Sequence, residues 1–341
     1  MTKKTNIWIL IMVLTHTVLI GKEKPDTLRF IHITDTHFCN LDGYNSSFAE
    51  KRQHYGNVTS SLSEFYELMP GKLKSDFMVI TGDMTDFYEA ESRTGSMLST
   101  QIEQFINLVD NYNIPTYMTL GNHDIASYWV NENSSYSSNQ LNAEKARAQW
   151  IKNASCFKNG TYYSRTFQVD TTTYRLIFLD NGYYSPERKT KDDAPNIIDK
   201  YQLLWLDNQL KISDNDVEII FMHIPLIAPE QSDLEPSRNK YFLDIQDTLA
   251  IPYERQNETK DKLDLWSVLE NNASTKVVFC GHHHSNVNNK VQVSDDYSLN
   301  QVMTGSFARD ARNWRLIQLT SDSIIISFPG VDKDQYSIST H

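Results

Sequence analysis

Cysteine is scarce in this chain of 341 residues, which contains only three. These are Cys39, Cys156 and Cys280. An odd and sparse set of this kind excludes the disulfide framework on which many small secreted domains depend. Stability is therefore expected to come from a hydrophobic core, and a chain of this length can bury a sizeable one.

An excess of positive charge is also absent. The 43 acidic residues outnumber the 32 basic ones, which gives a formal net charge of −11 at pH 7. Proteins that hold nucleic acid use a broad positive surface to neutralise its phosphates and release counterions. The composition therefore predicts no nucleic-acid-binding surface. A nucleotide is still permitted as a small substrate, because metal ions can bind its phosphate locally.

The chain lacks an apolar run long enough for a comfortable transmembrane helix. The N-terminal stretch 7–20 is interrupted by polar residues at 15–17 and falls short of the roughly 20 apolar residues that a membrane span needs. Lys3 and Lys4 precede it, and this order is typical of a secretory signal peptide. We therefore expect a signal peptide at residues 1–21 and export, so that the protein is secreted, periplasmic or at the cell surface. No stable membrane span is expected after cleavage, and an uncleaved N-terminal anchor is the alternative.

No internal repeat, linker or low-complexity tract divides the rest of the chain. One domain is therefore predicted over residues 26–330, followed by a C-terminal tail at 331–341. Short runs rich in β-branched and aromatic residues alternate with stretches of helical length, a pattern typical of α/β proteins. The runs that precede a motif are 28–33, 77–80, 116–120, 217–222 and 276–280. Further β-type runs are 302–304, 316–319 and 324–328, and the helical stretches are 48–68, 101–112, 200–212 and 260–270.

Five short polar motifs each begin where a predicted strand ends. In order they are Asp35-Thr36-His37, Gly82-Asp83-Met84-Thr85-Asp86, Gly121-Asn122-His123-Asp124, His223 before Ile224-Pro225, and Gly281-His282-His283-His284. Loops that leave neighbouring strands of an α/β sheet converge at one edge, so these side chains are expected to meet there.

The motifs contain the ligands needed for two adjacent divalent metals. Asp35 and His37, two residues apart, can chelate one ion, and the two carboxylate oxygens of Asp83 can bridge two ions. The remaining candidates are one amide oxygen and three imidazoles, from Asn122, His223, His282 and His284. This mixed oxygen and nitrogen set suits Mn, Fe or Zn. Each motif alone is a weak or moderate signal, and it is their joint occurrence in order that indicates a dimetal centre.

At these residues the chain resembles the calcineurin-like metallophosphoesterase superfamily, over roughly residues 28 to 320. The resemblance implies an α/β fold, a four-layer sandwich of two mixed β-sheets flanked by helices. It implies hydrolysis of phosphate esters by attack of a metal-bound hydroxide. The implied ligands of the first metal are Asp35, His37, Asp83 and His284, and those of the second are Asp83, Asn122, His223 and His282.

The same resemblance makes His123 the residue that protonates the leaving oxygen or stabilises transition-state charge, with Asp86 orienting its imidazole. Histidine is a ready proton donor near neutral pH, and a carboxylate partner fixes its tautomer. Asp124 is the alternative partner, or it braces the loop. Purple acid phosphatases place a metal-ligating tyrosine where this chain has Asp86, so the layout is more similar to the bacterial-type and class III phosphodiesterase branch.

Two segments that follow metal motifs interrupt the strand and helix pattern. These insertions, residues 125–163 and 226–259, are expected to form walls of the substrate cleft, and surface decoration is the alternative. They carry aromatic rings able to pack against a substrate group, namely Tyr128, Trp129, Tyr136 and Tyr241. Of these, Trp129 is the predicted substrate contact.

A loop after the last motif carries two arginines. Arg309 or Arg312 can fork onto a phosphate oxygen. The alternative is a surface arginine paired with Asp310.

The sequence thus predicts an exported dimetal phosphoesterase that prefers phosphodiesters. One alternative is a phosphomonoesterase of the acid or protein phosphatase type. An alternative of another class is a non-catalytic binding or scaffold protein that kept the fold. Such proteins usually lose a ligand or the histidine of the Gly-Asn-His motif, whereas every matching position is filled in this chain.

Overall fold

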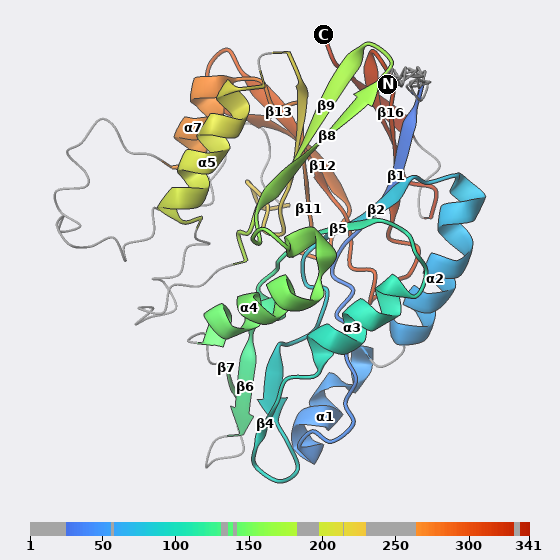
Figure 1. Ribbon diagram of the computed structural model, residues 1–341, viewed down its shortest axis with the longest axis vertical. Helices are drawn as coiled ribbons and strands as arrows, with labels where there is room; N and C mark the ends of the chain where they lie inside the picture. The colour runs from blue at the N-terminus through green and yellow to red at the C-terminus, as the bar shows by residue number, and fades with distance from the viewer. Residues whose placement is uncertain are drawn as a thin grey trace, which may run out of the picture.

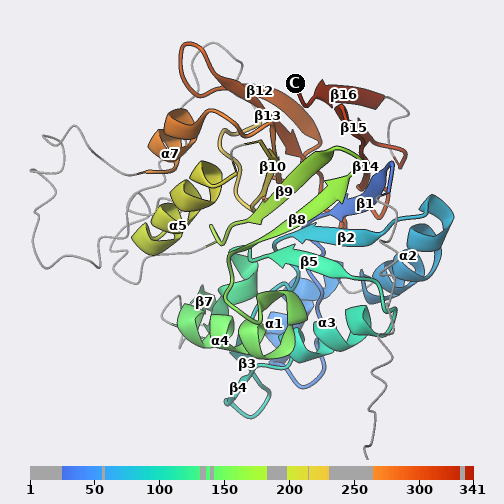
Figure 2. The ribbon, with the colours of Figure 1, turned by 45° about the horizontal axis from the view of Figure 1, so that its top comes forward.

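Two six-stranded mixed β-sheets pack face to face, with helices on both outer faces (Figures 1 and 2). This arrangement confirms the predicted four-layer α/β sandwich. The computed structural model describes residues 25–55, 58–130, 136–138, 142–182, 198–213, 215–229, 264–330 and 335–341. In the described part of the chain, no helix has the length and apolar character that a membrane crossing requires. The predicted signal peptide lies outside the described residues.

The first sheet has the strand order β16-β15-β14-β1-β2-β5. Its strands are β1 (Leu28–Ile33), β2 (Phe77–Thr81), β5 (Thr116–Thr119), β14 (Arg315–Leu319), β15 (Ser323–Ser327) and β16 (Gln335–Ser339). β1, β2 and β5 run parallel, while β14, β15 and β16 are joined by antiparallel pairs. β16 lies in the segment predicted as a tail, and its pairing with β15 extends the sheet beyond residue 330.

The second sheet has the order β12-β13-β11-β10-β9-β8. Its strands are β8 (Tyr163–Val169), β9 (Thr172–Phe178), β10 (Val217–Phe221), β11 (Val277–Cys280), β12 (Val287–Gln292) and β13 (Ser298–Met303). The four central strands are parallel, and the two outer strands pair with them in the antiparallel direction. Parallel strands covered on both faces read as continuous apolar runs, and β10 and β11 are buried throughout.

Aromatic side chains fill the space between the sheets. Phe30 of the first sheet lies 5.8 Å, centroid to centroid, from Phe221 of the second. Phe221 stacks in turn on Phe279 at 5.3 Å. These rings are fully buried, so the contact between the two sheets fixes how their edges meet.

The helices form the outer layers. α2 (Val58–Leu73), α3 (Gln101–Asp110) and α4 (Ala143–Asn153) lie on the side of the first sheet, and α5 (Lys200–Lys211) and α7 (Leu265–Asn272) cover the second (Figure 2). The helices on the first side share one core cluster with both sheets, whereas α5 and α7 form a separate cluster with the second sheet.

The prediction of a single helix over residues 48–68 is wrong. The structure has α1 (Ser46–Arg52), a 3₁₀ turn η1 (Gln53–Tyr55), and α2 beginning at Val58. Gly56 stands in the sequence between them, and glycine disfavours a helix interior by about 1 kcal/mol relative to alanine. The break matters because the last turn of α1 and η1 both reach the polar motifs.

A small third sheet, β4-β3-β6-β7, lies beside α1 (Figure 1). Its strands are β3 (Glu89–Glu91), β4 (Met97–Leu98), β6 (Ser127–Val130) and β7 (Tyr136–Ser138). The predicted insertion 125–163 therefore contains β6, β7 and α4. Residues 230–263, which include Tyr241 and most of the second predicted insertion, lie outside the described residues.

Candidate metal centre

The five motifs come together where the carboxyl ends of the parallel strands of both sheets meet. Backbone hydrogen bonds tie the motifs to one another. The Asp35 amide donates to the Gly82 carbonyl at 3.1 Å, and the His37 amide donates to the Asp83 carbonyl at 2.9 Å. In the second sheet the Gly281 amide donates to the His223 carbonyl at 2.9 Å. The edge predicted from the sequence is thus the edge at which the structure gathers these side chains.

Strained backbone accompanies the predicted ligands. Among non-glycine residues a positive φ is uncommon, and strain of this kind concentrates at functional sites. Five predicted ligands have it, namely Asp35 (50°), His37 (41°), Asp83 (47°), His282 (72°) and His284 (57°). The surrounding hydrogen bonds hold these residues in a conformation that an unconstrained chain would avoid.

The glycine of the third motif is required by close packing. A Cβ atom at Gly121 would lie 2.3 Å from both the amide nitrogen and Oδ1 of Asp83. Any side chain at this position would displace the Asp83 carboxylate. The absence of a side chain at Gly121 therefore lets the third motif pack directly against Asp83 of the second motif.

One cluster of ligand atoms comes from the first and last motifs. His284 Nε2 lies 3.0 Å from Asp35 Oδ1 and 3.1 Å from His37 Nε2. His37 Nε2 is also 4.0 Å from Asp83 Oδ2. These side chains are those predicted for the first metal: the ligand atoms of Asp35, His37 and His284 lie within 4.8 Å of one another, and Asp83 adjoins them at His37.

A second cluster shares Asp83. Asp83 Oδ2 lies 3.0 Å from His223 Nε2, and the ligand atoms of Asp83, His223 and His282 are all within 4.8 Å of one another. The Oδ1 atom of Asn122 lies 3.0 Å from His282 Nδ1, which brings the amide into the same group. These four side chains are those predicted for the second metal.

The tautomer of His223 follows from its other ring nitrogen. His223 Nδ1 lies 2.8 Å from the Thr81 carbonyl oxygen, which can only accept a hydrogen bond. Nδ1 therefore carries a proton, and Nε2 is the ring nitrogen that faces Asp83. A backbone carbonyl that fixes the ring in this way is a common partner of metal-ligating histidines.

The donor set fits divalent metals. Asp35 Oδ1 and His223 Nε2 are buried, make no hydrogen bond of good geometry among the described residues, and lie 3.0 Å from other candidate ligand atoms, His284 Nε2 and Asp83 Oδ2 respectively. Leaving a buried polar atom unsatisfied costs about 1–3 kcal/mol, so such atoms need a partner of another kind. A cation between the clustered atoms would satisfy both. The mixed oxygen and nitrogen chemistry is that expected for Mn, Fe or Zn.

The charges of the clusters also suit a cation. Burial alone would raise the pKa of the Asp83 carboxyl, but the nearby imidazoles of His223 and His123 hold that pKa well below its ordinary value. Burial and the neighbouring His223 lower the pKa of His282 to about 3. The carboxylate is thus ionised and the His282 imidazole neutral, which are the forms that bind metal.

His123 lies beside the clusters and contacts Asp86. Its Nδ1 atom lies 2.9 Å from the Asp86 carbonyl oxygen and 3.3 Å from Asp86 Oδ1. Because both oxygens are acceptors, Nδ1 is the donor and Nε2 is left for another partner. The His123 amide also donates to Asp83 Oδ1 at 2.8 Å. His123 keeps a side-chain exposure of 24%, whereas Asp86 is fully buried.

Asp124 has a different environment. Its Oδ2 accepts from the Gly121 amide at 2.8 Å, and its Oδ1 accepts from the Thr85 amide at 2.9 Å. It joins the second and third motifs as a brace. The geometry therefore places Asp86, and not Asp124, against the His123 imidazole.

The arginines of the loop after β13 have different surroundings. Arg312 Nη2 lies 2.7 Å from Asp310 Oδ2 in an exposed pair, which is the surface alternative left open by the sequence. Arg309 is exposed and follows Ala308, whose amide donates to the Asp35 carbonyl at 3.1 Å. Arg309 therefore stands on a loop anchored to the first motif.

Two side chains near the centre, Tyr55 and Arg52, were not predicted. Tyr55 of η1 stacks on the His37 ring, with centroids 4.5 Å apart and planes at 7°. Arg52 of α1 lies 3.2 Å from Asp86 Oδ1, and its guanidinium lies over the Tyr128 ring. Side chains alternate between the faces of a strand, so Trp129, the next residue of β6, points to the other face of the small sheet.

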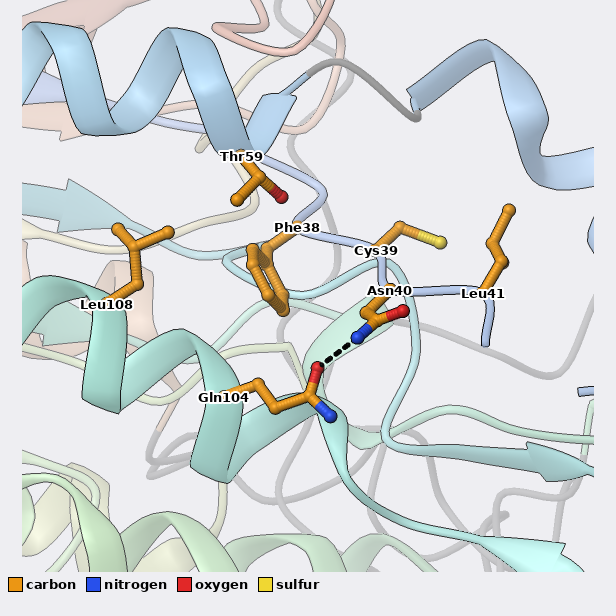
Figure 3. A pocket seen from close by; sticks show the side chains of 7 residues that line it. All are labelled: Phe38, Cys39, Asn40, Leu41, Thr59, Gln104 and Leu108. Carbon is orange, nitrogen blue, oxygen red and sulfur yellow. Dashed lines mark hydrogen bonds between the residues drawn. The ribbon is translucent and has the colours of Figure 1, made fainter. Parts of the chain in front are cut away.

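An open cavity of about 490 Å³ lies behind the first motif (Figure 3). It is lined by the loop that follows His37 and by side chains of α2 and α3, namely Phe38, Cys39, Asn40, Leu41, Thr59, Gln104 and Leu108. The Asn40 amide donates to Gln104 Oε1 across it at 2.8 Å. The lining includes no predicted metal ligand, so this cavity is separate from the clusters.

Comparisons with known proteins agree with this geometry. The sequence model of the calcineurin-like phosphoesterases matches residues 28–286. Acid sphingomyelinase-like phosphodiesterase 3b of Mus musculus is 30% identical over 178 residues, which are 49% of this chain and 37% of the mouse protein. The chain thus aligns with well under half of that relative's length. A dimetal phosphatase from Danio rerio has a TM-score of 0.56 at 15% identity, covering 93% of this chain and 100% of that one, and shares the fold.

Proposed function

Since the chain belongs to the calcineurin-like phosphoesterase family and is a metal-dependent phosphoric ester hydrolase, we propose that it is an exported enzyme that prefers phosphodiesters. The observation that supports a two-metal centre is the position of Asp83, which belongs both to the group with His223 and His282 and to a group with His37 and His123. We also propose that residues 26–330 form a single catalytic domain, to which β16 adds an edge strand.

Each cluster has an assigned role in this proposal. Asp35, His37, Asp83 and His284 would hold the first metal, and Asp83, Asn122, His223 and His282 would hold the second. Two such ions supply Lewis acidity toward phosphoryl oxygens and lower the pKa of a water molecule. Hydrogen bonds to the ring atoms that face away from the metal positions, such as that from His223 Nδ1 to the Thr81 carbonyl, orient the ligands.

His123 is proposed to deliver a proton to the leaving oxygen. Its Nδ1 proton is engaged by Asp86, which leaves Nε2 as the atom that can carry the transferred proton. Its partial exposure lets it meet a substrate, while the buried Asp86 fixes the ring. Proton transfer by a side chain positioned in this way contributes typically 10²–10⁴-fold to a rate.

The preference for diesters rests on two supports. The mouse relative is a phosphodiesterase by its name, although the alignment covers 37% of its length. Asp86 occupies the position at which purple acid phosphatases place a metal-ligating tyrosine, which makes the layout more similar to the bacterial-type and class III phosphodiesterase branch. Export is supported by the N-terminal sequence. The scaffold alternative is disfavoured, because each predicted ligand and His123 is present and reaches the cluster.

With added Mn, bis(p-nitrophenyl) phosphate is expected to be hydrolysed with a kcat/KM at least about tenfold above that of p-nitrophenyl phosphate, a difference of about 1.4 kcal/mol in transition-state stabilisation. Removal of metal with a chelator should abolish both activities, and Mn should restore them. The reverse preference would assign a phosphomonoesterase. Two bound metals without turnover of either ester would identify the scaffold alternative.

The small sheet is proposed to form one wall of the substrate cleft, because β6 leaves directly from the His123 motif. Trp129→Ala should then raise KM for a bulky diester by about two- to tenfold, corresponding to roughly 0.5–1.5 kcal/mol for one aromatic contact. Hydrolysis of a small ester should scarcely change, because the metal ligands and His123 are untouched. Tyr201→Ala, which removes an exposed ring from α5, is the matched control. A lower melting temperature with an equal loss on all esters would show instead that Trp129 covers the core.

A further inference from the structure

Asp86 is a shared acceptor for three positively polarised groups. Its Oδ1 atom lies 3.2 Å from Arg52 Nη1, 3.3 Å from His123 Nδ1 and 3.3 Å from His37 Nδ1. The carboxylate is fully buried. Asp86 Oδ1 therefore faces the imidazoles of His123, the proposed general acid, and of His37, a proposed metal ligand. It also faces the guanidinium of Arg52, a residue that belongs to none of the five motifs.

Arg52 is itself held in place from two sides. Its guanidinium carbon lies 4.9 Å from the centroid of the Tyr128 ring on β6 and 5.7 Å from that of Phe48, one turn earlier on α1. Cations are attracted to aromatic faces at such distances, and a planar guanidinium can stack on them. The Arg52 side chain is 19% exposed. It thus joins α1, the small sheet and the loop after β2 at Asp86.

We propose that Arg52 is a positioning residue for the general acid, because it holds the Asp86 carboxylate in the orientation that fixes the His123 imidazole. The proposal rests on the proposed function, since it needs His123 as the proton donor. Among the described residues Arg52 pairs with Asp86 and lies over the rings of Phe48 and Tyr128, so it acts on His123 through Asp86.

Asp86 is a buried carboxylate with competing partners. Burying a carboxylate is costly unless it is paired and hydrogen-bonded. Arginine is always charged, so it attracts Asp86 throughout a reaction in which the proton on His123 comes and goes. Without Arg52, the carboxylate keeps only the two imidazoles and loses the contact that sets its rotation. His123 Nδ1 would keep its 2.9 Å contact with the Asp86 carbonyl oxygen but lose a fixed carboxylate beside it, so the ring would sample more orientations that are unsuited to proton transfer.

The test compares two esters of the same class that differ in the acidity of the leaving group. Bis(p-nitrophenyl) phosphate releases an acidic phenol that hardly needs a proton, whereas diphenyl phosphate releases a poorer leaving group that does. Arg52→Gln is expected to lower kcat for diphenyl phosphate by about 10–100-fold, the usual cost of losing an outer-sphere partner. Loss on the nitrophenyl ester should stay within about threefold. If the enzyme prefers monoesters, phenyl and p-nitrophenyl phosphate form the equivalent pair.

Two further variants separate positioning from a general structural role. Arg52→Lys keeps the charge but not the planar fork, so its kcat for diphenyl phosphate should lie between those of Arg52→Gln and the wild type. This variant also carries the test if Arg52→Gln does not fold. Arg165→Gln removes an arginine that also lies over two rings, at 5.0 Å from Tyr163 and 5.9 Å from Tyr117, but on β8. This control should leave the ratio of the two rates unchanged. Metal content should stay at two ions per chain in all variants.

The outcomes distinguish the proposal from the function on which it rests. A selective loss on the poorer leaving group, with metal retained and partial recovery in Arg52→Lys, would support it. If the wild-type enzyme is active and neither Arg52 variant changes the ratio of its rates on the two esters, the Arg52 proposal alone is overturned. Equal losses on both esters together with lost metal would also overturn it. A wild-type protein that hydrolyses neither ester would contradict the proposed function, and the Arg52 proposal with it.

Discussion

Asp83→Asn is expected to abolish turnover and to lower the metal content from two ions per chain to one or none. The Asp83 carboxylate lies 3.0 Å from His223 Nε2 and 4.0 Å from His37 Nε2, so it faces both clusters. An amide has one oxygen acceptor and no charge, so the substitution removes a charged ligand from two coordination spheres at once. The His123 amide also loses a charged acceptor.

Elemental analysis and turnover measured on the same Asp83→Asn preparation check this expectation. Asp207→Asn is the matched control, because this carboxylate pairs with Lys211 on α5, away from the centre. The control should keep both metals and full activity. If Asp83→Asn retained two tightly bound ions per chain, the bridging role would be wrong.

His123→Asn should lower turnover by about two to four orders of magnitude, the usual range for a lost general acid. Both metals should remain, because neither proposed ligand set includes His123. The loss should be smaller for esters with very acidic leaving groups, since these depart without a proton. Asparagine can still donate to the Asp86 carbonyl, so the surrounding structure has a reason to persist.

Steady-state kinetics on the two esters and metal analysis of His123→Asn test this second expectation. His54→Asn is a suitable control, because His54 is an exposed histidine of η1. Loss of metal in parallel with activity would show that His123 is a ligand and not a proton donor.

The strands that lead into the motifs were predictable from sequence because they are buried on both faces. β2 and β11 are buried at every position and appear as apolar runs, while β10 is equally buried but carries Glu218 within its run. β8 was missed because most of its residues are only partly buried, which weakens the pattern. The prediction of one helix over 48–68 was wrong because the residues on both sides of η1 have a helical pattern, which hid the break between α1 and α2.

That the candidate ligands lie together was also predictable, because each follows the strand that positions it. Arg52 was not, since its contact with Asp86 joins residues 34 positions apart and depends on how α1 packs. Tyr55 was missed for the same reason. The face on which Tyr128 and Trp129 lie depends on the register of β6, and a shift of one residue would exchange their faces.

Anomalous diffraction from crystals of the Mn-loaded protein tests the central claim most directly. Two peaks about 3.5–4 Å apart are expected, the spacing of two-metal phosphoesterase sites. Asp83 should lie between them, with Asp35, His37 and His284 around one peak and Asn122, His223 and His282 around the other. A single peak, or two peaks that Asp83 does not join, would contradict the account.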